Sequence, residues 1–86
     1  MHSKWMNRNM TMYHDELTAE VDCRRHAVEQ NRPMCVMHQT EVFQYIIQPF
    51  KEEETHDLIK RAEGRLVLMG VSRQLGDGQA TYEVQR

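Results

Sequence analysis

The stretch at residues 32–39, RPMCVMHQ, decides how this sequence is interpreted. After Pro33, the run MCVMH would be apolar on both of its faces if it is extended. Strands of this kind are buried on both sides, so the run predicts a central strand of a sheet rather than an edge strand. It also gathers a thiol, two thioethers and an imidazole, which raises the question of a soft-metal site.

The strand interpretation argues against that metal site. Side chains alternate between the two faces of a strand, so Cys35 and Met37 share one face and the other three share the opposite face. Structural zinc also needs four ligands, usually in closely spaced pairs, and Cys23 and Cys35 are far apart in the sequence. We expect sulfur side chains that fill the core, no metal and no cofactor; Cys23 could pair with Cys35 across a sheet, but only incidentally.

Upstream, residues 17–24 read LTAEVDCR and alternate strictly between apolar and polar side chains. Period two over eight positions is typical of a half-buried strand, which is the structure we predict. The alternative is a helix capped by Asp15, with Leu17 and Val21 one turn apart on a face that charged residues interrupt. The chain is then expected to reverse at residues 30–33, QNRP.

Downstream, residues 40–48 read TEVFQYIIQ, and Thr40 followed by an acid resembles a helix start. The β-branched and aromatic content of this stretch would also suit a strand. A second helix is predicted over residues 49–63, PFKEEETHDLIKRAE, because three glutamates come early while Lys60 and Arg61 come late. Gly64 is expected to close it.

The C-terminal region has the pattern of a β-hairpin. Residues 65–73, RLVLMGVSR, form a nearly continuous apolar run, Asp77-Gly78 marks a turn, and residues 80–86 alternate. The sequence as a whole therefore predicts a small α+β domain. It would have about four mostly antiparallel strands, with one kinked helix or two short helices packed on one face.

Length and composition indicate a single folded unit. The chain has 86 residues, of which 40% are hydrophobic and 28% are charged, as is ordinary for a globular domain. We divide it into an N-terminal arm at residues 1–14, flexible or ordered by a partner, and a domain at residues 15–86. Two cysteines and seven methionines favour a reducing, cytoplasmic setting, and neither a membrane-spanning run nor a signal peptide is expected.

The sequence gives no reason to predict an enzyme. Cysteines, histidines and acids are present, but no cysteine or serine lies in a recognisable nucleophile turn. The GDG at residues 76–78 lacks the spacing of a phosphate-binding loop. The acids Glu52 to Glu54 could bind a hard cation, but they would point in different directions on a helix and not converge on one ion. We therefore predict no catalytic residues and no metal ligands.

We predict a non-catalytic protein that binds another macromolecule and that acts as an inhibitor, adaptor or subunit. A protein is the partner we favour. Small domains without chemistry have such roles in phages and mobile elements, and a homodimer would enlarge a small core. Trp5 is the expected aromatic anchor. The candidate partner-binding residues are Lys4, Trp5, Arg8, Tyr13, Arg24 and Arg25.

Nucleic-acid binding is the alternative function. Arg24, Arg25 and Arg32, together with the basic aromatic arm, could track phosphates and stack on bases. A net charge of −2 and neighbouring acids weaken that interpretation.

Overall fold

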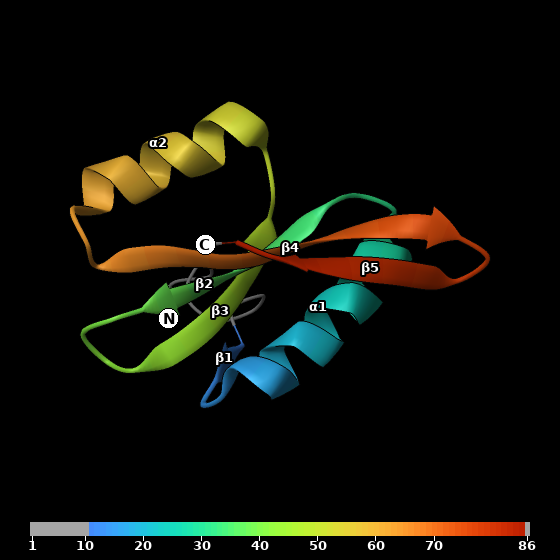
Figure 1. Cartoon of the computed structure of the whole chain (residues 1–86), viewed down its shortest axis with the longest axis horizontal. Helices are drawn as coiled ribbons and strands as arrows, with labels where there is room; N and C mark the ends of the chain where they lie inside the picture. Colours follow the sequence, from blue (N-terminus) through green and yellow to red (C-terminus); the bar gives the residue numbers. More distant parts are fainter. Residues whose placement is uncertain (1–10, 86) are drawn as a thin grey trace, which may run out of the picture.

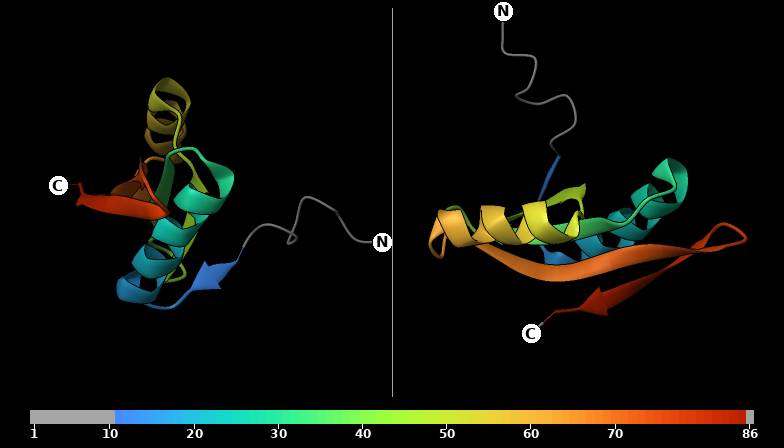
Figure 2. Two further views of the ribbon diagram at one scale, coloured as in Figure 1. Left: turned by 90° about the vertical axis from the view of Figure 1, so that its right-hand side faces the viewer. Right: turned by 90° about the horizontal axis from the view of Figure 1, so that it is seen from above.

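The computed structural model describes residues 11–85, which form an antiparallel sheet with one helix on each face (Figures 1 and 2). The sheet has five strands in the order β1-β3-β2-β4-β5. The elements in chain order are β1 (Met12–Tyr13), α1 (Glu16–Gln30), β2 (Met34–Gln39), β3 (Gln44–Pro49), α2 (Glu52–Ala62), β4 (Leu66–Gly76) and β5 (Gln79–Val84). The α+β class is thus confirmed, with five strands in place of about four.

Strand β2 is the centre of the sheet, as the opening stretch predicts. It pairs with β3 on one side and β4 on the other, and its first four side chains are buried. Met34 and Val36 join the core beneath α1, whereas Cys35 and Met37 join the core on the α2 side. Because the sulfur groups are divided between two faces, they do not converge on one ion, and the described residues contain no cluster of metal ligands.

The predicted strand at residues 17–24 is wrong, because this segment belongs to helix α1. The Asp15 side chain caps the helix by accepting from the Thr18 backbone N–H, and Asn31 ends it in a left-handed conformation. The buried residues Ala19, Cys23 and Ala27 are four positions apart and form one face. Cys23 therefore lies above the sheet in the α1-side core, and both Cys23 and Cys35 are free thiols.

The helix predicted from Thr40 is also wrong, and the competing strand interpretation describes the second half of that segment. Residues 40–43 form a turn, and β3 pairs with β2 from Gln39↔Gln44 to Met34↔Pro49. Ile46 and Ile47 point to opposite faces and enter or line the two cores. Burial on both faces explains the β-branched run better than a helical stripe does.

Helix α2 and the C-terminal hairpin are confirmed, but the helix begins at Glu52 and not at Pro49, which is the last residue of β3. Helix α2 covers β4 from the face opposite to α1 (Figure 1), which corrects the expectation that the helices share one face. The hairpin turns at residues 77 and 78 and joins β4 to β5. Within the hairpin, Tyr82 of β5 lies over Gly70 of β4, where a Cβ atom would have no room.

Neither helix in the described residues has the length and apolar composition required to cross a membrane.

Candidate interaction surface

The structure places the sequence-predicted binding residues in different situations. Lys4, Trp5 and Arg8 lie outside the described residues. The remaining three, Tyr13, Arg24 and Arg25, lie on β1 and α1. The end of the predicted arm contributes β1, which pairs with β3 through Tyr13↔Tyr45.

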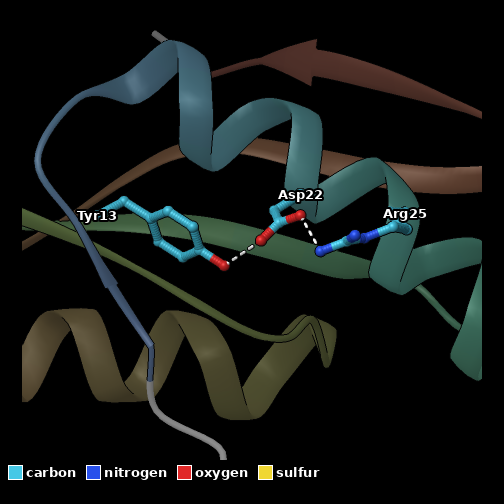
Figure 3. A network of polar contacts seen from close by, with 3 residues as sticks. All are labelled: Tyr13, Asp22 and Arg25. Carbon is cyan, nitrogen blue, oxygen red and sulfur yellow. Dashed lines mark hydrogen bonds and ion pairs between the residues drawn. The ribbon is translucent and has the colours of Figure 1, made fainter.

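Tyr13 and Arg25 are brought together, but through an acid that neutralises the basic side chain. The Tyr13 hydroxyl donates to Asp22 Oδ2 at 2.5 Å, and Arg25 donates to the other oxygen of Asp22 (Figure 3). Tyr13 is only 8% exposed. This network ties β1 to α1, and it leaves the Tyr13 ring unavailable for stacking on a partner's base.

The burial of Tyr13 predicts a loss of stability at alkaline pH. Burial, aided by the hydrogen bond to Asp22, raises the pKa of Tyr13 from its ordinary value of 10.0 to about 12. An unfolded chain releases this proton near pH 10, so the contribution of neutral Tyr13 is complete below pH 10 and is lost as the pH rises toward 12. The free energy of unfolding should fall over that interval by on the order of 2 kcal/mol from this group alone.

Urea unfolding at a series of pH values measures this effect. Tyr13→Phe removes the titrating group, so the free energy of unfolding should fall less steeply with pH in this variant. A smaller dependence on pH should remain, because burial also raises the pKa of the Cys35 thiol to about 12. Identical slopes in the two proteins would contradict the assignment.

The other two arginines of the predicted patch also have partners on the chain. Arg24 forms an ion pair with Glu20, with 2.6 Å between Nη1 and Oε2. Arg32 donates from Nε and Nη2 to Gln30 Oε1 at 2.9 and 2.6 Å. A phosphate would have to compete with these acceptors, which weakens the support for nucleic-acid binding.

A different surface stands out at the turn between β2 and β3. Val42 and Phe43 are both exposed there, and the Phe43 side chain is 75% exposed. Phe43 has a φ of 54°, in the left-handed region that a bulky side chain rarely adopts. The turn therefore holds an aromatic ring in solvent at a cost in backbone strain.

The neighbouring loop fixes the start of this turn. The Thr40 N–H donates to the Arg65 carbonyl at 3.1 Å, and the Thr40 hydroxyl donates to the Gly64 carbonyl at 3.0 Å. These bonds join the turn to the connection between α2 and β4, at the end of the molecule opposite to the β4–β5 turn (Figure 1). The two hydrogen bonds of Thr40 thus hold the start of the turn that carries Phe43.

A hollow of about 330 Å³ lies between these two loops. It combines apolar side chains with an amide, a carboxylate and a guanidinium, and Gln39 Oε1 is buried without a hydrogen-bond partner among the described residues. Leaving such a buried acceptor unpaired costs about 1–3 kcal/mol. Its lining residues are Gln39, Glu41, Val42, Ala62, Arg65 and Leu66. We call Phe43 and this hollow the turn surface.

The turn surface combines an apolar ring with polar and charged groups. Its groups are an aromatic anchor, an amide acceptor and two exposed charges of opposite sign, Glu41 and Arg65. None of these residues carries a thiol, hydroxyl or imidazole, and the one carboxylate among them, that of Glu41, is exposed. One signal in the sequence could have indicated the turn surface. If residues 40–43 are assigned to a turn, Phe43 is an aromatic residue that is not needed for the core.

Comparisons of this protein with family models, curated proteins and solved structures find no match. Function is therefore inferred from the chemistry of the turn surface.

Proposed function

We propose that this protein is a non-catalytic binding protein that attaches to another protein through its turn surface. The observation that carries the proposal is Phe43, an exposed aromatic side chain on strained backbone beside a hollow. Energetically dominant interface residues are often aromatic and sit in a desolvated pocket of the partner. The strain at Phe43 has no compensating contact within the core, which supports a role outside the folded chain.

In the proposed complex, Phe43 inserts into an apolar pocket of the partner. A donor of the partner, such as a backbone N–H, enters the hollow and bonds the Gln39 carboxamide. Glu41 and Arg65 form a polar rim that orients the partner and disfavours wrong ones. The protein would act as an inhibitor, adaptor or subunit by occupying a surface of its partner.

Phe43→Gly should separate stability from binding. Glycine adopts a φ of 54° without strain, so the free energy of unfolding should rise by about 1 kcal/mol. Loss of the anchor should weaken partner binding by about 30-fold or more. Urea unfolding and titration calorimetry with the isolated partner measure the two effects.

Asp77→Gly is the matched control. Asp77 has the same φ of 54° but lies in the β4–β5 turn, at the opposite end of the molecule (Figure 1). Its stability gain should be smaller because aspartate tolerates this conformation better than phenylalanine, and its partner affinity should not change. If Phe43→Gly bound the partner as well as the unmodified chain, the turn surface would not be the binding site.

The partner itself can be identified by comparative pull-down. Native lysate is passed over the unmodified chain, Phe43→Gly and Trp5→Ala, and bound proteins are quantified by mass spectrometry. A specific partner is one whose recovery depends on Phe43; dependence on Trp5 would place the predicted arm in the same interface. Bound nucleic acid that is lost on Arg24 and Arg25 replacement or at moderate salt would instead support the alternative function.

A further inference from the structure

The outer surface of α1 carries an apolar stripe. Leu17 is 68% exposed and Val21 is 53% exposed, and the two are one turn apart on the side away from the core. Val28 lies seven residues beyond Val21, on the same face by helix geometry, and is half-buried. Helix α1 forms the outer layer on its face of the sheet (Figures 1 and 2), and among the described residues Leu17 and Val21 remain exposed, whereas Val28 is partly covered. We call Leu17, Val21 and Val28 the α1 stripe.

One pair of opposite charges lies beside the middle of the α1 stripe. Glu20 and Arg24 lie on the same flank of the stripe and form an ion pair. The other charged residues of α1 do not separate by sign, because Glu29 follows Arg24 and Arg25 in the second half of the helix. An acid and a base on either side of the middle of a helix complement the same pair on a reversed copy.

We infer that α1 is a dimerisation helix on which two copies of this chain pack antiparallel. The two-fold axis passes near the middle of the stripe, at the level of Asp22 and Cys23. Leu17 then faces Val28 of the second copy, and Glu20 faces Arg24 of the second copy. The two existing Glu20–Arg24 pairs become a ring of four alternating charges beside an apolar seam.

Several properties favour a second copy over an unrelated partner. The Glu20–Arg24 pair beside the stripe is self-complementary in charge when a second copy packs in reverse, as a two-fold interface requires. Antiparallel packing also places the positive end of each helix dipole against the negative end of the other. One helix pair is smaller than a standard protein interface, so the dimer should be weak and concentration-dependent. This inference is independent of the proposed function, because the α1 stripe shares no residue with the turn surface.

Analytical ultracentrifugation of the full chain, at concentrations up to about 1 mM, tests the stripe. The unmodified chain should dimerise, and Leu17→Glu should raise the dissociation constant by at least about 10-fold. Leu75→Glu is the matched control: Leu75 is 64% exposed on β4 and should leave the dissociation constant unchanged. A chain that stays monomeric throughout, or a Leu17→Glu variant that dimerises normally, would overturn the inference.

A charge exchange tests the antiparallel arrangement even if a single variant loses structure. Glu20→Arg alone and Arg24→Glu alone each place like charges across the axis, so each should be monomeric. An equimolar mixture of the two should form a heterodimer, and the double variant E20R/R24E should dimerise by itself. Circular dichroism checks the fold of each variant. Absence of both the heterodimer and the double-variant dimer would reject this geometry.

Discussion

Gly70→Ala is expected to lower the free energy of unfolding by about 3 kcal/mol. An ideal Cβ atom at Gly70 would lie 2.2 Å from Tyr82 Cζ and 2.4 Å from its hydroxyl oxygen, distances that no pair of side chains tolerates. The Tyr82 ring packs against the core beneath α1, so it can yield only by giving up that burial. Glycine-to-alanine changes at ordinary backbone angles usually stabilise slightly, and here the contact should outweigh that gain.

A double-mutant cycle isolates this contact. In a Tyr82→Ala background the ring is absent and Gly70→Ala should cost almost nothing, whereas Tyr82→Phe retains the ring and should retain the cost. Gly76→Ala is the control, because its φ is 93° and nothing lies near its missing Cβ; about 1 kcal/mol is expected, with no dependence on Tyr82. Urea unfolding followed by circular dichroism gives all these values, and a Gly70→Ala cost below about 0.5 kcal/mol would show that the strands adjust.

The parts of the fold that the sequence predicts correctly are those in which local signals agree with tertiary packing. In β2, burial on both faces produces an apolar run that no surface element would need. In α2, the charge order and the left-handed end at Glu63 and Gly64 mark a helix independently of what it packs against. The β4–β5 hairpin is similarly marked by its Asp77-Gly78 turn.

Helix α1 was not predicted because its small side chains let it pack closely on the sheet. Its core face consists of two alanines and a cysteine, while larger apolar side chains point to solvent, so the apolar period of a surface helix is absent. The accidental alternation of residues 17–24 then resembles a strand. Only the sheet beneath α1, whose large side chains supply the core volume, explains why small residues face inward.

The turn surface could not be predicted because its residues converge only in the folded chain. Gln39 and Arg65 meet through the pairing of β2 with β4, which the sequence does not specify. The turn that exposes Phe43 was also concealed, since Thr40 followed by Glu41 resembles a helix start. Among the predicted site residues, Tyr13 and Arg25 do come together. Both bind Asp22, so their side chains hold β1 against α1 and do not form a free basic patch.

Two changes two residues apart, on opposite faces of α1, test the helix against the strand alternative for residues 17–24. Ala19→Leu is expected to lower the free energy of unfolding by about 3 kcal/mol, because Ala19 is fully buried against the sheet and the added atoms must push α1 away from it. Leu17→Ala is expected to change it by less than about 0.5 kcal/mol, because Leu17 is mostly exposed and alanine favours helix. If residues 17–24 formed a half-buried strand, Leu17 and Ala19 would share the inward face, and Leu17→Ala would instead leave a cavity costing about 2–5 kcal/mol.

Unfolding measured at low protein concentration keeps the α1 stripe free of a second copy, so that Leu17→Ala reports on the single chain. Ala27→Leu, two turns further along the same buried face, should repeat the large loss seen with Ala19→Leu. The pattern of a large cost at positions 19 and 27 with almost none at position 17 fits the buried face of a helix. A strand at residues 17–24 does not produce this pattern, because Leu17 and Ala19 would then share one face and Ala27 would lie outside the strand. A large cost at Leu17 comparable to that at Ala19 would reject the helix, and with it the exposed stripe on which dimerisation depends.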